Sequence, residues 1–157
     1  MSEDQFSHLD EEGRVHMVDV GGKEPTDREA VAEATVVMKQ ATRDLLFAGE
    51  LPKGDALATA RVAGIMAAKR TADLIPLCHP IAITSVSVDI MSADYGALLR
   101  ATVATRDRTG VEMEAMIGVS VAALALYDMI KGVDRGAYVD DVRLLSKSGG
   151  RSGEWTR

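Results

Sequence analysis

The sequence predicts an α+β domain, and three of its segments carry most of the evidence. Residues 84–90 and 99–104 alternate apolar and polar side chains, which is the period of two residues that a half-buried strand shows. Residues 115–127 contain no charged side chain and are mostly Ala, Val, Leu, Ile and Met, so a helix there would be apolar nearly all round. Such a helix belongs in a protein core. It is also shorter than the roughly 20 apolar residues that cross a bilayer, so we expect no membrane span.

The first half of the chain is expected to hold one strand and two helices. A cluster of β-branched residues favours a strand over 28–38, although the neighbouring alanines would suit a helix equally well. A short helix over 39–48 ends at a glycine, and a longer helix over 55–72 follows a Pro-Lys-Gly turn. In the longer helix, small residues such as Ala60 and Gly64 recur at helical spacing. They form a stripe that allows close packing.

The second half is expected to hold a hairpin, the buried helix and a last strand. The turn 94–96 joins the runs 84–90 and 99–104, the helix covers 111–131 and stops at a glycine, and a final strand covers 139–145. The full order is strand, helix pair, strand, strand, helix, strand. This order suits a ferredoxin-like fold, in which an antiparallel four-stranded sheet has its helices packed on one face.

The length of 157 residues is that of one domain. Residues 1–22 mix charges and glycines without apolar periodicity, so we expect a flexible N-terminal arm there. Residues 23–157 then form a single ferredoxin-like domain. No internal repeat divides it.

Bulk charge and cysteine content exclude several classes of protein. A net charge of -6 argues against a nucleic-acid surface, because following phosphates requires clustered Lys and Arg. The one cysteine, Cys78, cannot form an internal disulfide, and no basic segment followed by an apolar run opens the chain as in a secretory signal. A cytoplasmic location is the simplest expectation.

Ionisable residues stand at both ends of the expected buried helix. Glu112 and Glu114 fall in its first turn, where carboxylates interact well with the helix dipole, while Asp128 and Lys131 are three residues apart near its end. Ordinary first-turn charges and an exposed ion pair are the more common explanations for each. However, Glu114 and Asp128 share a helical face and stand ~21 Å apart at 1.5 Å per residue. One small ligand therefore cannot reach both ends unless a loop or a second subunit closes the gap.

Cys78 and His79 lie between two prolines that favour extended backbone, so they should be held in a stiff segment. A histidine fixed in this way can bind a base, a phosphate or a carbonyl. Metal ligation is less favoured, because zinc normally takes at least three protein ligands and the only other histidines, His8 and His16, lie in the arm. For Cys78 a packing role is favoured over nucleophilic chemistry, since no activating group is evident.

Lys53 and Lys147 each lie close to glycines, whose backbone amides can approach a phosphate. A solvated surface lysine is the alternative for both. A catalytic base would need its pKa pulled from ~10.4 toward ~7 to 8 by burial or another cation. Asp128 has the opposite effect on Lys131, because a neighbouring carboxylate favours the charged form of a lysine. Lys131 is therefore suited to donating a proton or to stabilising phosphate charge. Lys53, if an assembly placed it near Lys131, could be the base.

Several motifs of the chain together resemble one known family. They are His16-Met17-Val18-Asp19-Val20, Lys53-Gly54-Asp55, the run 63–71, Asp73-Leu74-Ile75-Pro76-Leu77-Cys78-His79-Pro80, Thr109-Gly110-Val111-Glu112-Met113-Glu114-Ala115, Tyr127-Asp128-Met129-Ile130-Lys131 and Lys147-Ser148-Gly149-Gly150. This ordered set closely resembles the MoaC family of molybdenum cofactor biosynthesis, the cyclic pyranopterin monophosphate synthases. The likeness covers nearly the whole chain, although each motif alone is weak. The hairpin adds little to it.

The resemblance implies a reaction, an assembly and residue roles. A phosphorus-oxygen lyase of this family would convert (8S)-3',8-cyclo-7,8-dihydroguanosine 5'-triphosphate to cyclic pyranopterin monophosphate with release of pyrophosphate. It would be a homohexamer, a trimer of dimers, with its sites at the dimer interface. No cofactor is required, the site holds no metal of its own, and magnesium could accompany the triphosphate.

By the same resemblance, Asp128 is the catalytic acid/base residue, assisted by Lys53 and Lys131. Arg28 and Lys147 would face the triphosphate. The full set of implied substrate contacts is Asp19, Arg28, Leu77, Cys78, His79, Glu112, Met113, Glu114 and Lys147.

Two other classes of function stay open on the residues alone. One is an acidic ligand-binding or regulatory domain, which would bind a guanine-derived triphosphate without releasing pyrophosphate. The other is a metal hydrolase built on His79 and Glu114, which would contain stoichiometric zinc. Neither accounts for the whole ordered set of motifs.

Overall fold

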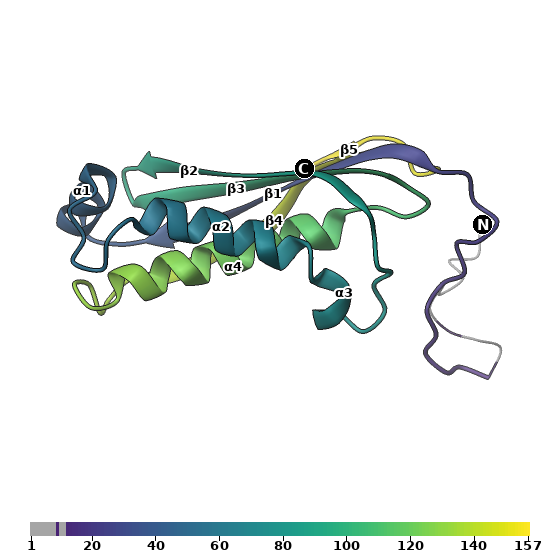
Figure 1. Ribbon diagram of the computed structural model, residues 1–157, viewed down its shortest axis with the longest axis horizontal. Helices are drawn as coiled ribbons and strands as arrows, with labels where there is room; N and C mark the ends of the chain where they lie inside the picture. Colours follow the sequence, from purple (N-terminus) through teal and green to yellow (C-terminus); the bar gives the residue numbers. More distant parts are fainter. Residues whose placement is uncertain (1–8, 10–11) are drawn as a thin grey trace.

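A five-stranded antiparallel sheet with helices α2 and α4 on one face forms the body of the protein (Figure 1). This computed structural model describes Leu9 and residues 12–157, so His8, Asp10 and Glu11 of the expected arm lie outside the described residues. The sheet order is β2-β3-β1-β4-β5. The elements are β1 (Thr26–Val37), α1 (Gln40–Ala48), α2 (Ala56–Ala68), α3 (Thr71–Leu74), β2 (Ile83–Ala93), β3 (Gly96–Asp107), α4 (Glu112–Ile130), β4 (Tyr138–Ser148) and β5 (Trp155–Thr156).

The α+β class and the antiparallel sheet are confirmed, but the expected number of four strands is wrong. The additional strand β5 has two residues and pairs with β4 at Ser146↔Thr156 and Lys147↔Trp155. Beyond it, the Arg157 amide donates to Leu145 O at 2.8 Å, and the Arg157 guanidinium lies 5.7 Å from the centre of the Trp155 ring. A strand this short has no periodicity of its own. Its conformation depends on the neighbour with which it pairs.

The helix expected over 55–72 is divided in two. It ends at Ala68, and the four-residue helix α3 begins at Thr71, because Arg70 has φ −116° and ψ 16° and leaves the helical region. The buried Thr71 hydroxyl donates to the Ala68 carbonyl at 3.0 Å. The Thr71 side chain thus donates to a carbonyl that would have accepted a backbone amide hydrogen bond if the helix had continued.

Helix α1 begins without a cap from its own sequence. Its N-cap residue, Lys39, makes no side-chain capping bond. The buried Asp134, which lies in the loop after α4, instead accepts hydrogen bonds from the Lys39 amide at 2.8 Å and the Thr42 hydroxyl at 3.2 Å. The start of α1 and the chain that leaves α4 are therefore held together.

The core lies between the sheet and the helices, and α4 runs through it. Ala115, Val119, Ala122 and Leu126 are all 0% exposed, as expected for a helix that is apolar on most sides. Among the described helices, α4 alone has the length and apolar composition to cross a bilayer. The same apolar composition is required for α4 to pack against the sheet and α2 in the core.

The predicted stripe of small residues on α2 is confirmed, and it faces α4. A Cβ atom on Gly64 would stand 2.7 Å from the Gly118 carbonyl oxygen and 2.9 Å from the Ala122 Cβ. Ala60 and Ala68, on the same stripe, are 0% and 1% exposed. The two helices thus approach so closely that only glycine fits at position 64.

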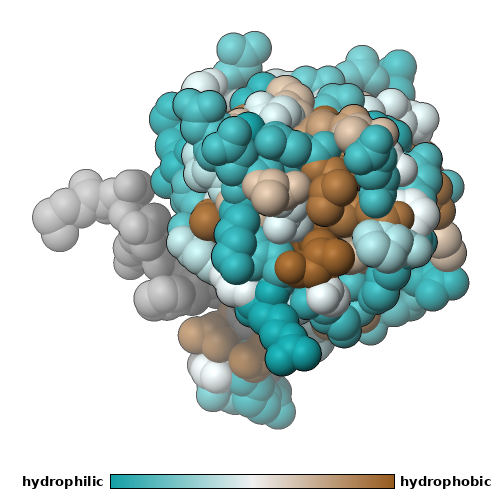
Figure 2. All heavy atoms as spheres, turned by 90° about the vertical axis from the view of Figure 1, so that its left-hand side faces the viewer, coloured by the Kyte–Doolittle hydropathy of each residue, from teal (hydrophilic) through white to brown (hydrophobic). Residues whose placement is uncertain are grey.

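One end of the molecule carries an apolar surface. Figure 2 views the end where α1 lies in Figure 1 and shows hydrophobic side chains gathered near its centre, with hydrophilic ones around them. The β2–β3 turn and the chain after α4 belong to this end, where Tyr95 and Val133 are 44% and 43% exposed. Exposed apolar patches of this kind are typical of interaction surfaces.

The close helix crossing predicts unequal effects of two glycine substitutions. Gly64→Ala should lower the free energy of unfolding by about 1–2 kcal/mol, because the strain of overpacking exceeds the gain in helix propensity. Gly118→Ala is the matched control, since the nearest atoms to its added Cβ lie at 3.4 Å, an ordinary contact. Urea unfolding of both variants measures the difference. Equal effects would contradict the proposed role of Gly64.

Candidate active site

The predicted site residues gather at the two ends of α4. Lys53, Asp128 and Lys131 lie together at its C-terminal end, and we call them the lysine–aspartate cluster. Most of the other predicted residues line two cavities at its N-terminal end. The two groups are separated by the length of a helix of 19 residues.

In the lysine–aspartate cluster, one carboxylate is shared by two cations. Lys53 Nζ lies 3.1 Å from Asp128 Oδ2 and 2.7 Å from the Asp128 carbonyl oxygen, and Lys131 Nζ lies 2.7 Å from Asp128 Oδ1. The turn before α2 presents Lys53. Asp55 fixes that turn by capping the helix, with its Oδ1 2.9 Å from the Ala58 amide.

The charges of the cluster reinforce one another. Hydrogen bonds first from Lys131 and then from Lys53 hold the pKa of Asp128 below its usual range, and the Asp128 carboxylate raises the pKa of Lys131. At neutral pH, Asp128 is an anion and Lys131 a cation that can donate a proton. The three side chains are 45–55% exposed, so a ligand can approach them.

The expectation that Lys131 pairs with Asp128 is confirmed, and Lys53 joins them within the same chain. No second subunit is needed to bring the two lysines together, because residue 53 lies beside the C-terminal end of α4 once α2 packs along it. Both lysines contact opposite oxygens of one carboxylate.

A cavity of about 350 Å³ at the N-terminal end of α4 brings together six predicted residues with Lys23 and part of the segment before β1. The six are Leu77, Cys78, His79, Glu112, Met113 and Glu114. His79 Nε2 lies 2.8 Å from the Val18 carbonyl oxygen. Because a carbonyl only accepts, Nε2 carries the proton, and in the neutral ring Nδ1 remains an acceptor.

Glu114 lies in the wall of this cavity with only 3% of its surface exposed. Burial, and secondarily the charge of Glu112, raise its pKa to about 7. Both protonation states are therefore populated near neutral pH, so Glu114 can accept or donate a proton there. Burial and the Glu114 carboxylate also raise the pKa of the Cys78 thiol, which agrees with the expectation that Cys78 is not a nucleophile.

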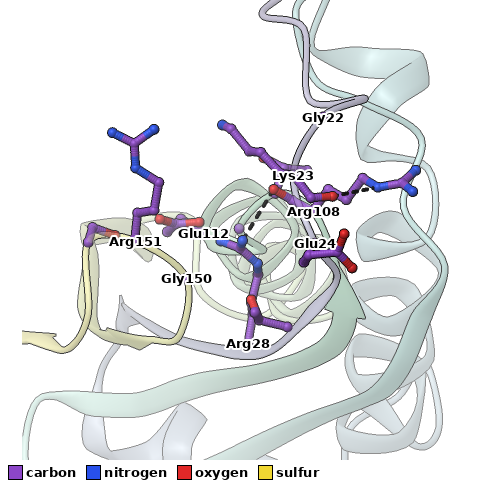
Figure 3. A pocket seen from close by; sticks show the side chains of 12 residues that line it. Gly22, Lys23, Glu24, Arg28, Arg108, Glu112, Gly150 and Arg151 are labelled. Carbon is purple, nitrogen blue, oxygen red and sulfur yellow. Dashed lines mark hydrogen bonds between the residues drawn. The ribbon is translucent and has the colours of Figure 1, made fainter.

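A larger cavity of about 650 Å³ adjoins the first, and basic side chains line it (Figure 3). The two cavities share four lining residues, Lys23, Thr109, Gly110 and Glu112, so they adjoin each other. The basic side chains of the larger cavity are Lys23, Arg28, Arg108 and Arg151. We call it the basic cavity.

The remaining predicted contacts are placed in different ways. Lys147 Nζ forms an ion pair with Glu112 Oε1 at 2.9 Å, beside the basic cavity. Arg28 lines the basic cavity itself. Asp19 lines neither cavity; its Oδ1 accepts from the Gly21 amide at 2.8 Å and holds a turn in the segment before β1.

Three basic residues of this site, Lys23, Arg108 and Arg151, were not among those predicted from the sequence. Each stands within two residues of a glycine, as do the predicted Lys53 and Lys147. A glycine beside a cation is too common a pattern to identify a site alone. Only the fold shows which glycine-flanked cations face one space.

Within Leu9 and residues 12–157, no group of three or more His, Cys, Asp and Glu side chains is arranged to hold a metal ion. Cys78, His79 and Glu114 line one cavity, but they form no such group. The geometry therefore does not favour the metal hydrolase hypothesis.

The raised pKa of Glu114 predicts a pH-dependent stability. The fold favours the protonated carboxyl, so the stability that it contributes is present at pH 4.5 and lost as pH rises through about 7. Glu114→Gln, which is neutral at every pH, should be more stable than the wild type by up to about 3 kcal/mol at pH 8.5, with most of that difference absent at pH 5. Urea unfolding at both pH values measures it, with the exposed Glu50→Gln as control. A difference independent of pH would contradict the burial argument.

Similarity to known proteins extends over all the predicted site residues at both ends of α4. The model of the MoaC family matches residues 17–150, which include every predicted site residue. Cyclic pyranopterin monophosphate synthase 2 of Mycobacterium tuberculosis H37Rv is 59% identical over 153 residues, covering 98% of this chain and 92% of the relative. The Streptomyces coelicolor cyclic pyranopterin monophosphate synthase is 55% identical over 155 residues, covering 99% and 91%. That of Herpetosiphon aurantiacus is 58% identical over 152 residues, covering 96% and 93%. The chain belongs to the MoaC family.

Proposed function

We propose that this chain is a cyclic pyranopterin monophosphate synthase of molybdenum cofactor biosynthesis. It would convert (8S)-3',8-cyclo-7,8-dihydroguanosine 5'-triphosphate to cyclic pyranopterin monophosphate, releasing pyrophosphate as a phosphorus-oxygen lyase. Family membership and the names of its relatives support this proposal. The structural observation that carries it is the Asp128 carboxylate held between Lys53 and Lys131.

The proposed catalytic roles follow from the charges of the cluster. Two cations make Asp128 a weak base in the free protein. A substrate phosphate that draws one lysine away would remove part of that effect, so the pKa of Asp128 would rise as substrate binds. Lys131, whose charged form Asp128 stabilises, is then the proton donor or phosphate contact. Lys53 is the second proton-transfer partner.

The proposed substrate contacts lie at the other end of α4. Polar groups of His79 and Glu114 would orient the ring system, and the adjoining basic cavity would take the phosphates, with Arg28 and Lys147 among their partners. Leu77, Cys78, Glu112 and Met113 complete the wall. Asp19 remains in the proposal as a contact outside both cavities.

The separation of the two groups supports a site shared between subunits. Glu114 and Asp128 are ~21 Å apart along one straight helix, farther than one compact substrate spans. A second copy that places its lysine–aspartate cluster against these cavities would complete the site. The apolar surface in Figure 2 lies at the same end of α4 as the cluster and supports a subunit contact there. We propose a dimer interface of this kind within a homohexamer built as a trimer of dimers.

The proposal also includes the fold, the partner and cellular location, and the cofactor requirement. The strands and helices follow the order β1, three helices, β2, β3, α4 and β4, and the sheet order β2-β3-β1-β4 supports a ferredoxin-like fold extended by β5. The partner is a nucleotide-derived small molecule rather than nucleic acid or a membrane, and the location is the cytoplasm. No cofactor is required, and magnesium would enter only with the triphosphate.

Removal of the Asp128 charge tests the proposed reaction. Asp128→Asn should lower the rate of pyrophosphate release and of pterin formation by about 10²–10⁴, the usual contribution of a general acid or base. Asp44→Asn is the matched control, since Asp44 is an exposed carboxylate in an ion pair with Arg43, at 3.1 Å. Wild-type protein that binds the substrate but releases no pyrophosphate would instead indicate a ligand-binding domain. Full activity of Asp128→Asn would remove Asp128 from the mechanism.

Mixed assemblies test the shared site. Two-fold symmetry gives a dimer two equivalent sites, so a heterodimer of Asp128→Ala and His79→Ala chains has one intact site and about half of wild-type activity. Co-expression with two tags and tandem purification isolates it. Asp128→Ala mixed with Lys131→Ala is the control and should recover nothing, because both residues belong to one cluster. Failure of the first pair, with mixed assemblies verified, would contradict the interface.

A further inference from the structure

The basic cavity is completed by the C-terminal turn of residues 149–153, which joins β4 to β5. We propose that this turn is a further polyphosphate-binding element, in which Arg151, together with Arg108 from the loop before α4, contacts the phosphates. The inference rests on the proposed function only in taking the polyphosphate to be that of the substrate. Arg151 lies beyond the segment 17–150 that matches the family, so its role is argued from this structure alone.

The cavity is basic within an acidic chain. Four cationic side chains line it, against the two carboxylates of Glu24 and Glu112, while the whole chain has a net charge of -6. Glu112 is already paired with Lys147 at 2.9 Å, so little negative charge remains uncompensated. The lining of this cavity therefore carries an excess of positive charge, which can attract an anion.

The arginines of the cavity keep free N–H donors. Arg28 uses Nε and Nη2 on the carbonyls of Asp107 and Arg108, at 2.9 and 3.2 Å, and Arg108 uses Nε on the carbonyl of Lys23, at 2.8 Å. These bonds fix the two guanidinium groups and leave other donors unused. Among the described residues, no hydrogen bond or ion pair engages Arg151, which is exposed. Figure 3 shows the basic side chains reaching the cavity from separate segments.

Two glycines allow the turn to lie against the start of β1. Gly149 and Gly150 have φ of +90° and +72°, in the left-handed region that other residues rarely adopt. A Cβ on Gly149 would collide with the Asp27 carbonyl, and one on Gly150 would collide with the Arg28 guanidinium. Pairing of Trp155 with Lys147 then closes the turn. The result is that Gly150 lies against the Arg28 guanidinium and the next residue, Arg151, lines the same cavity.

The dimensions and donors fit a chain of phosphates better than a single phosphate. The cavity of about 650 Å³ is far larger than one phosphate, and its cations come from separate segments. Arginine is suited to such a ligand because its planar group forms paired hydrogen bonds to phosphate oxygens. The adjoining cavity of His79 and Glu114 offers space for the rest of a nucleotide-like molecule.

Calorimetric titration of the intact, assembled protein with inorganic tripolyphosphate tests this without any turnover. Arg151→Ala and Arg108→Ala should each weaken tripolyphosphate binding about 5- to 10-fold, with Arg151→Lys intermediate. Arg106→Ala is the matched control, because Arg106 is an exposed arginine of β3 that does not line the cavity. Pyrophosphate should bind more weakly than tripolyphosphate, and orthophosphate weaker still.

A second variant tests the turn rather than the charge. Gly150→Ala keeps every cation, but its Cβ would overlap the Arg28 guanidinium, so either that side chain or the turn must move and binding should weaken at least as much as in Arg151→Ala. Circular dichroism and the assembled mass check that it folds. Equal tripolyphosphate affinity of wild type, Arg151→Ala and Gly150→Ala would overturn the inference, as would an equal loss in Arg106→Ala.

Failure of this inference is distinguishable from failure of the proposed function. If the enzyme turns over but Arg151→Ala leaves both the KM and tripolyphosphate affinity unchanged, the turn has no role and the reaction stands. If tripolyphosphate binding depends on Arg151 but no pyrophosphate is ever released, the binding element stands and the proposed reaction fails.

Discussion

Close packing of α2 on α4 is the constraint on which the rest of the structure depends. At Gly64 the helices approach to a distance that leaves no room for a methyl group. This contact places the turn before α2 beside the C-terminal end of α4, where Lys53 contacts Asp128. Glycine and alanine in this crossing are therefore part of the site's architecture, although they touch none of its ligands. A larger distance between α2 and α4 would still allow an apolar core but would move Lys53 away from Asp128.

The same helix carries two carboxylates in opposite states, for separate physical reasons. Asp128 is exposed between two cations, which lower its pKa, whereas Glu114 is buried, which raises its pKa to about 7. One is a stable anion at neutral pH and the other a group that exchanges a proton there. Rigid helix geometry keeps them apart, so a reaction that uses both needs a loop or a second chain to bridge them. The proposed interface would therefore serve the chemistry as well as the stability of the assembly.

Charge is distributed so that an acidic protein presents a basic cavity. The cations around it come from the segment before β1, the start of β1, the loop before α4 and the C-terminal turn. None of these segments is strongly basic alone. The sheet brings them together because β1 lies between β3 and β4, so that the start of β1 meets the ends of both neighbours. Pairing of β5 with β4 then holds the C-terminal turn at the same edge.

Local patterns were sufficient for most of the elements and for part of the site. Alternation along the hairpin, the uncharged run of α4 and the small-residue stripe of α2 record burial directly, and the spacing of Asp128 and Lys131 is enough to predict their pairing. The break of the longer helix at Arg70, the strand β5, the contact of Lys53 with Asp128 and the assembly of the basic cavity could not be predicted in this way. Each depends on groups distant in sequence, whose hydrogen bonds and charges meet only after α2, α4 and the sheet have packed. The periodicity of a segment predicts which of its faces is buried. It does not predict which residues of other elements pack against that face.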